Sequence, residues 1–83
     1  MKKRKGQKVV MYGTETCVWC EKAREFFKEH GVKYKEIDVG KNEKEAEKMI
    51  KKSGQNGTPV IEIGKEIVVG FDEGRLRRFL KIK

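Results

Sequence analysis

The feature that most constrains the fold of this chain is a Cys-Val-Trp-Cys motif at residues 17–20, which holds both of its cysteines. The motif stands between an apolar run at residues 9–12 and a segment at residues 21–29 with the spacing of an amphipathic helix. This order predicts a strand, a short turn and a helix that begins at the cysteine pair. The strand then carries the first sulfur out of the fold, and the amino end of the helix faces it.

The amino end of a helix favours an ionised cysteine. The thiolate is the reactive form, and a free thiol has a pKa of about 8.5. Helix amino ends carry roughly +0.5 of a charge and unpaired N–H groups, and Cys-x-x-Cys thiols there reach pKa values of about 3.5–7.5. We therefore predict that Cys17, at or just before the first turn, attacks a target disulfide. Cys20 lies one turn on and is predicted to resolve the mixed disulfide, leaving a Cys17–Cys20 bridge.

Two other interpretations of the motif stay open. A zinc site needs four ligands, but the chain has no second cysteine pair and His30 is its only histidine, so zinc would need carboxylate ligands. A purely structural disulfide across so short a loop would stabilise little, because the gain grows with loop length. We expect redox chemistry, with no metal ligands and no bound cofactor.

The length of 83 residues predicts one small domain. Charged residues make up 41% of the chain, but its apolar residues fall in short patterned runs, which indicates a folded protein. Much of the net charge of +8 lies at residues 2–5, so we interpret residues 1–6 as a flexible basic tail and residues 7–83 as the domain. Nucleic-acid binding is disfavoured, because no basic stripe with stacking aromatics is evident.

The sequence also carries expectations about location and assembly. The apolar run at residues 9–12 is too short for a signal peptide, and no stretch is long enough to span a bilayer. Two cysteines do not make the disulfide framework of a secreted protein. We therefore expect a cytoplasmic protein with no membrane partner. Nothing indicates an oligomer, so we expect a monomer.

Cap and turn residues divide the chain into seven elements in the order βαβαββα. The predicted helix caps are Thr16, Asn42 and Asp72, and Gly64-Lys65 fits a type II′ hairpin turn. The first two strands are expected to be parallel. Strands are predicted at residues 8–12, 32–39, 60–63 and 66–69, and helices up to residue 29, at residues 43–52 and from residue 73 to about residue 82.

Apolar residues at helical spacing predict the core. Phe26 and Phe27 are expected to be buried, and His30 is interpreted as a residue of the helix end, because Gly31 follows as a stop. The inward-facing residues of the two later helices are predicted to be Ala46, Met49, Ile50, Leu76, Phe79 and Leu80.

The chain after residue 7 resembles the glutaredoxin branch of the thioredoxin-fold superfamily, and more narrowly the small bacterial and archaeal glutaredoxin-like proteins that carry Cys-Pro-Trp-Cys. The Cys-x-x-Cys pair followed by T-P-V and then G-F-D at these spacings makes the resemblance specific. It implies a thioredoxin-like α/β fold with a four-stranded mixed sheet flanked by three helices. The matching segments are M-Y-G-T-E-T-C-V-W-C at residues 11–20, I-D-V at 37–39, S-G-Q-N-G-T-P-V at 53–60 and I-V-V-G-F-D at 67–72.

The resemblance also implies a binding surface. Pro59 is expected to be cis and to lie against the cysteines, and the backbone of Thr58 to pair with an extended substrate. Residues 70–72 would hold the zwitterionic end of glutathione at the start of the last helix, and Gln55 its carboxylate. Judged by residue type alone, Pro59 could equally be a strand-entry proline, Gln55 a loop amide and Asp72 a helix cap.

Three residues depart from the family pattern. Val18 replaces the usual proline, Thr14 stands where many glutaredoxins carry a lysine, and Val69 replaces the first of two glycines before the aspartate. The last two departures weaken a strict glutathione interpretation. Trp19 lies between the cysteines and is expected to be exposed there, where it could contact substrates.

Together these features predict a dithiol–disulfide oxidoreductase that reduces protein or glutathione mixed disulfides through Cys17 and Cys20. The alternative is a carrier of a [2Fe–2S] cluster bridged between two chains by the first cysteine. The expected partners are disulfide-containing proteins, with either glutathione or a thioredoxin-reductase-like flavoprotein as reductant. The residues expected to contact substrate or glutathione are Val18, Trp19, Gln55, Thr58, Pro59, Gly70, Phe71 and Asp72.

Overall fold

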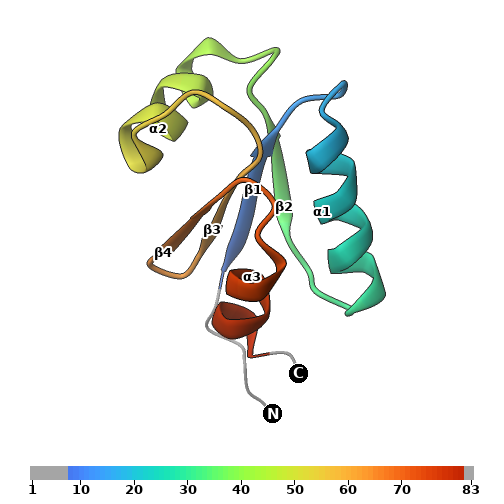
Figure 1. Ribbon diagram of the computed structural model, residues 1–83. Coiled ribbons are helices and arrows are strands. Elements are labelled where there is room, and N and C mark those ends of the chain that lie inside the picture. Colours follow the sequence, from blue (N-terminus) through green and yellow to red (C-terminus); the bar gives the residue numbers. More distant parts are fainter. Residues whose placement is uncertain (1–7, 82–83) are drawn as a thin grey trace.

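The computed structural model describes residues 8–81 and contains the predicted element order βαβαββα (Figure 1). The tail predicted at residues 1–6 lies outside the described residues. The elements are β1 (Val9–Gly13), α1 (Val18–Glu29), β2 (Lys35–Asp38), α2 (Glu43–Ser53), β3 (Val60–Ile63), β4 (Glu66–Val69) and α3 (Glu73–Leu80).

The strands form one sheet in which β1 is an inner strand. The strand order is β2-β1-β3-β4, with β1 and β2 parallel and the other two pairs antiparallel. The predicted four-stranded mixed sheet is therefore confirmed. The β3–β4 hairpin turns at Gly64, whose φ of 59° lies in the left-handed region that a type II′ turn requires at its first central position.

Strand β1 is buried on both faces, so its side chains divide between two apolar clusters. Val9 and Met11 pack with residues of α1 and α3, while Val10 and Tyr12 pack with Met49 of α2. The division follows from the period of two along a strand. Helices α1 and α3 accordingly lie on one side of the sheet and α2 on the other (Figure 1).

The second strand is shorter than predicted. It begins at Lys35 rather than at residue 32, because the chain that leaves α1 is used to close that helix. The backbone N–H of Val32 donates to the carbonyl of Phe27 over 2.9 Å, and Val32 and Tyr34 pack half-buried against the α1–α3 cluster. As predicted, His30 ends the helix as its C-cap, and Gly31 follows with a φ of 64°.

The later helices confirm most predictions and correct two. Asn42 and Asp72 cap α2 and α3, each accepting a backbone N–H bond of 3.2 Å on its side chain. Ile50, predicted to face inward, is 41% exposed, because it lies about 100° around the helix from the fully buried Met49. Helix α3 ends at Leu80 rather than near residue 82, because Lys81 turns left-handed and its N–H closes the helix end.

Candidate active site at the start of the first helix

The first cysteine lies where the loop after β1 meets α1. Cys17 occupies the N-cap position of α1 with extended backbone angles (φ −87°, ψ 114°), and its Sγ accepts a 3.0 Å hydrogen bond from the backbone N–H of Cys20. Serine or aspartate makes this bond at many other helix starts. The prediction that Thr16 is the cap is therefore wrong. Thr16 is exposed and one residue too early, and the sulfur itself satisfies the amino end of the helix.

The surroundings of Cys17 favour its thiolate. Burial acts to raise the pKa of the half-buried Cys17, but hydrogen bonds from the Cys20 thiol, from Thr58 and from the backbone N–H groups of Cys20 and Trp19 outweigh it. The net effect holds the pKa of Cys17 below its ordinary value. The predicted direction of the shift is thus present, and its main source is a set of specific donors at the helix start.

The second cysteine has the opposite character. Cys20 is fully buried in the cluster between the sheet and α1. Burial, followed by its hydrogen bond with Cys17, raises the pKa of Cys20 to about 11. Of the two thiols, Cys17 is therefore the one that ionises first as the pH rises, while Cys20 keeps its proton.

A glycine makes room for the buried sulfur. A Cβ atom placed on Gly13, the last residue of β1, would lie 2.7 Å from Cys20 Sγ, closer than such atoms approach in real structures. Any side chain at this position would displace the sulfur. From the sequence, Gly13 falls in the short turn after the strand predicted at residues 8–12, and no local pattern shows that a sulfur seven residues later packs against it.

The Thr58–Pro59 segment lies beside the cysteines. The peptide bond before Pro59 is cis, as predicted, and Pro59 itself is buried. The Thr58 side chain lies close enough to both thiols to lower the pKa of each. The carbonyl of Pro59 accepts a 2.7 Å bond from the N–H of Gly70, which ties the end of β4 to this segment. Residues of three separate chain segments therefore meet around Cys17.

An exposed apolar patch adjoins Cys17. Trp19 is 57% exposed, and its ring stacks on that of Phe71 with centroids 6.4 Å apart and an interplanar angle of 20°. Phe71 rests edge-on against the buried ring of Phe26, at 6.0 Å. Val18, which is 64% exposed, lies between Cys17 and Trp19 in the chain. We call the surface formed by Val18, Trp19 and Phe71 the aromatic patch.

The remaining predicted contact residues have local structural roles. Gly70 has a φ of 79°, which turns the chain from β4 towards α3. Asp72 caps α3, and its carboxylate also pairs with the Arg75 side chain over 3.4 Å. Gln55 is exposed. Its backbone N–H donates to the Ser53 hydroxyl oxygen, and its carbonyl accepts from the same hydroxyl. The contacts described for Gln55 do not extend to the cysteines.

An arginine not singled out from the sequence holds the loop beneath the cysteines. Arg24 of α1 binds the Glu36 carboxylate of β2 with Nε at 2.9 Å and also with Nη2, which in addition donates to the Thr14 carbonyl over 3.1 Å. The Thr14 backbone in turn lies beside Cys20 and acts to lower the pKa of that thiol. Hydrogen bonding to Glu36 raises the pKa of Arg24, so it stays charged. The sequence did not single out Arg24, because a charged residue at this position is typical of the solvent-exposed face of a helix.

The chain matches a known protein family over most of its length. A family model for glutaredoxin matches residues 9–68, which is well over half of the chain. The chain belongs to the glutaredoxin family. Family membership supports a thiol–disulfide oxidoreductase type of function for it.

Individual relatives agree with this assignment. The glutaredoxin chain is 34% identical over 73 residues to an uncharacterised glutaredoxin-like 8.6 kDa protein in a rubredoxin operon of Clostridium pasteurianum, covering 88% of this chain and 97% of that protein. It is 34% identical over 65 residues to glutaredoxin 3 of Escherichia coli K12, covering 78% of each. A solved glutaredoxin from Archaeoglobus fulgidus superposes with a TM-score of 0.83 at 33% identity, covering 89% and 86% of the two chains.

The departures from the glutaredoxin pattern can be placed in the structure. Val18 begins α1 directly after the capping sulfur, so the missing proline leaves the helix start intact. Thr14, where many glutaredoxins carry lysine, contributes its carbonyl to Arg24. Glu15, whose charge could oppose a thiolate nearby, is paired with Lys41 at 2.8 Å. Val69 is 42% exposed on the edge strand.

The part of the chain that the structure describes has neither a cluster of metal ligands nor a membrane-spanning helix. Between residues 8 and 81, no three side chains of histidine, cysteine, aspartate or glutamate gather as metal ligands would. In the same part of this glutaredoxin, no helix is both long and apolar enough to cross a bilayer.

Proposed function

We propose that this chain is a dithiol–disulfide oxidoreductase that reduces protein or glutathione mixed disulfides, with Cys17 as the attacking thiolate and Cys20 as the resolving thiol. The observation that carries the proposal is the asymmetry of the pair. The pKa of Cys17 is lowered at a half-buried helix cap, whereas burial raises the pKa of Cys20 to about 11. A nucleophile must be ionised and accessible, and only Cys17 combines a lowered pKa with exposure to solvent.

The proposed reaction has two exchanges. The Cys17 thiolate attacks one sulfur of a substrate disulfide, forms a mixed disulfide and releases the other sulfur as a thiolate that takes up a proton. Cys20 then loses its proton and attacks Cys17 Sγ, which releases the second substrate thiolate and leaves a Cys17–Cys20 disulfide. Two electrons pass from the dithiol to the substrate, so the protein must be reduced again before the next cycle.

The environment of Cys20 explains how a thiol with so high a pKa could act second. Part of the rise in its pKa comes from the hydrogen bond and the charge of the Cys17 thiolate. Once Cys17 is bound in a mixed disulfide, that charge is gone, and Cys20 ionises more readily. The order of the two steps then follows from the electrostatics of the pair.

Substrates would dock over the cysteines. In this proposal the backbone of Thr58, beside Pro59, pairs with an extended segment next to the substrate disulfide. The aromatic patch of Val18, Trp19 and Phe71 supplies apolar contact area on the other side of Cys17. For glutathione, Gly70, Asp72 and Gln55 would supply polar contacts. Either glutathione or a thioredoxin-reductase-like flavoprotein serves as the electron donor.

Two cysteine variants test the assignment. Cys17→Ser should lose activity in an insulin-reduction assay and in a glutathione mixed-disulfide assay, because the serine hydroxyl stays protonated. Cys20→Ser should accumulate a mixed disulfide that mass spectrometry detects. Full activity of Cys17→Ser, or failure of Cys20→Ser to trap any substrate, would contradict the proposed roles.

The reductant is identified by a second experiment. The oxidised protein is incubated either with glutathione, glutathione reductase and NADPH or with a thioredoxin reductase and NADPH, and NADPH consumption is followed. The system that reduces the oxidised protein again identifies the class of electron donor. Recycling by neither would contradict both proposed reductants.

A further inference from the structure

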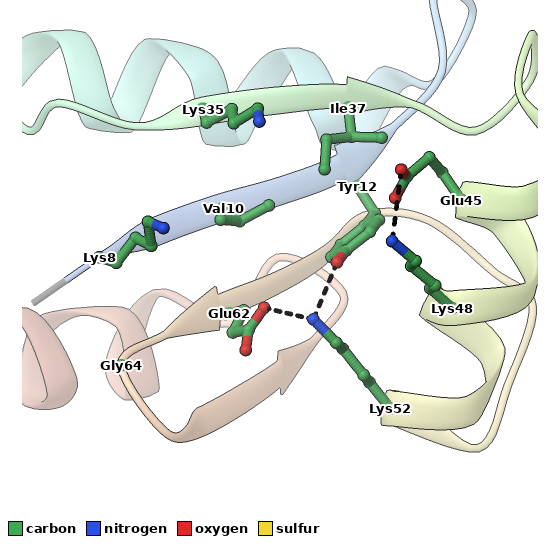
Figure 2. Close-up of a pocket in the computed structure, with 10 residues that line it drawn as sticks. All are labelled: Lys8, Val10, Tyr12, Lys35, Ile37, Glu45, Lys48, Lys52, Glu62 and Gly64. Carbon is green, nitrogen blue, oxygen red and sulfur yellow. Dashed lines mark hydrogen bonds and ion pairs between the residues drawn. The ribbon is translucent and has the colours of Figure 1, made fainter.

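The sheet face on the α2 side carries a groove with a cavity volume of about 400 Å³. Its floor follows from the strand register. Val10 and Tyr12 point to this face from β1, and Ile37 lies beside Tyr12 on β2. Figure 2 shows α2 next to Tyr12 at one end of the groove, with no helix drawn over Lys8 and Lys35 at the other end. The volume lies in the range of about 300–1,000 Å³ that is typical of small-molecule sites.

The rim of the groove is positively charged. Lys8, Lys35, Lys48 and Lys52 line it against only two carboxylates, those of Glu45 and Glu62. Lys52 pairs with Glu62 at 3.0 Å and Lys48 with Glu45 at 3.8 Å, and dashed lines mark both contacts in Figure 2. Within residues 8–81, neither Lys8 nor Lys35 belongs to an ion pair. The uncovered end of the groove is therefore its free positive end.

The hydroxyl of Tyr12 marks the other end. Tyr12 is only 3% exposed, and its hydroxyl oxygen accepts a 3.1 Å bond from Lys52 Nζ, as Figure 2 shows. The hydroxyl hydrogen is left to donate, and the described chain offers it no acceptor. A tyrosine hydroxyl both accepts and donates, so this donor is available to a ligand oxygen in the groove.

We propose that this groove binds a small organic anion: its acidic group at Lys8 and Lys35, its flat apolar body over Val10 and Ile37, and an oxygen acceptor at the Tyr12 hydroxyl. An apolar floor with a few polar groups at its ends is the usual composition of such sites. The apolar members of the groove belong to the α2-side cluster, whereas Cys20 belongs to the other one. The site is therefore separate from the redox centre. The alternative is that the lysine stems only cover the sheet and hold no ligand.

Amide NMR of the full, reduced chain tests the proposal with 6-hydroxy-2-naphthoate, which has a carboxylate, a flat body and a hydroxyl oxygen. We expect saturable shifts of the Val10, Lys35 and Ile37 amides. Two comparison compounds separate the contributions: 6-hydroxy-2-naphthamide lacks the charge, and acetate lacks the body. Both are expected to bind at least about fivefold more weakly, the scale of one or two partly exposed charge pairs.

Variants then locate the anion. Lys8→Gln combined with Lys35→Gln is expected to weaken naphthoate binding about fivefold. Both lysines are exposed, so the fold should be unaffected. The matched control combines Lys44→Gln with Lys51→Gln, two exposed lysines of α2 outside the groove lining, and should bind as the wild type does.

Several results would overturn the proposal. These are the absence of saturable shifts at the floor residues, equal binding of the neutral amide, an unchanged affinity in the Lys8/Lys35 double variant, or an equal loss in the Lys44/Lys51 control. Binding of a hexaglutamate peptide at this face without binding of the naphthoate would also overturn it, because the occupant would then be an acidic peptide. Disulfide reductase activity of the same variants should stay at the wild-type level in every case.

Discussion

Cys17 and Cys20 share one helical turn but differ in almost every physical respect. Cys17 stands outside the helix as its cap and receives donors, whereas Cys20 points into a dry cluster and loses its hydration. Donors stabilise an anion, and burial destabilises one, so the pKa values move in opposite directions. This separation is the basis of the proposed division between attack and resolution.

The first prediction concerns the ionisation of Cys17. The rate of its alkylation by iodoacetamide, followed by mass spectrometry across pH, should inflect below the ordinary thiol pKa, because only the thiolate reacts. Thr58→Val removes a donor at nearly constant size and should move the inflection to higher pH. Thr16→Val, at the exposed neighbour of Cys17, is the control and should leave it in place. An inflection at the ordinary thiol value in the wild type would contradict the site as described.

The second prediction concerns the space at Gly13. Gly13→Ala should destabilise the protein by about 1–3 kcal/mol in urea unfolding, the usual cost of overpacking a filled core. Its φ is not in the left-handed region, so the backbone accepts alanine and the cost comes from the contact with Cys20 Sγ. Resolution of the mixed disulfide should slow as well. Gly57→Ala, where the nearest atom is 3.7 Å away, should be close to neutral. Equal stability of the two variants would refute the steric argument.

The position of α1 relative to the strands is set by more than its apolar face. Arg24 links α1 to β2 through Glu36 and to the loop after β1 through the Thr14 carbonyl. The Arg24 and Glu36 side chains are about 30% exposed, 28% and 31% respectively, so the pair is only partly screened. A planar, bidentate group suits this three-way contact, and a lysine cannot reproduce it.

The third prediction follows from that geometry. Arg24→Lys keeps the positive charge but loses the planar guanidinium that contacts Glu36 and Thr14 together. The variant should lower the free energy of unfolding by about 1 kcal/mol. It should also shift the reduction potential of the Cys17–Cys20 pair, measured by equilibration with glutathione redox buffers, because the Thr14 loop beneath Cys20 is loosened. Arg78→Lys on the exposed face of α3 is the matched control. A stability loss with an unchanged potential would limit Arg24 to a structural role.

The fourth prediction concerns the aromatic patch, which joins the start of α1 to the chain before α3. Trp19→Ala should lower kcat/KM for insulin reduction about fivefold to tenfold, the usual scale for losing an interface aromatic, with a smaller effect on hydroxyethyl disulfide. Because Trp19 is 57% exposed, stability should change little. Ile50→Ala, at the exposed apolar residue of α2, serves as control. An equal loss of kcat/KM on both substrates would mean that Trp19 affects the cysteines themselves and not the docking of protein substrates.

The sheet of the whole molecule separates two kinds of surface. One face, with α1 and α3, buries Cys20 and presents Cys17 at its end, while the other face, with α2, carries the lysine-rimmed groove. Substitutions on one of these surfaces can therefore leave the packing of the other unchanged. The ionisation of Cys20, by contrast, is coupled to the stability of the entire fold, because only folding buries it.

The fifth prediction is the pH dependence of that stability. The pKa of Cys20 is raised on folding, from about 8.5 in the unfolded chain to about 11. Its contribution is therefore fully present below about pH 8.5 and is lost as the pH rises through 11. Urea unfolding of the reduced protein between pH 8 and pH 11 should show a steeper loss in the wild type than in Cys20→Ala. If the free energy of unfolding fell in parallel with pH in the two proteins, burial would not be raising the pKa of Cys20.

Much of the architecture was readable from the chain. Asn42 and Asp72 predicted the starts of their helices, Gly64 predicted the hairpin turn, and the apolar run predicted a strand at residues 8–12. These signals work because capping, turn formation and residue periodicity are decided by neighbours a few positions away. The Cys-x-x-Cys spacing is of the same kind, since one helical turn is enough to bring the two sulfurs together.

The rest depended on segments that meet only in the folded chain. The amino-acid order cannot show that Gly13 leaves space for Cys20 Sγ, or that Arg24 reaches both Glu36 and the Thr14 carbonyl. Nor does it show that Thr58, forty-one positions after Cys17, comes close enough to that sulfur to lower its pKa. Local pattern thus determined which elements form and where the thiols stand along the chain. Packing between distant segments buries Cys20 and brings Thr58 to Cys17, and so determined how far apart the two pKa values lie, because a pKa depends on every group that surrounds the sulfur in space.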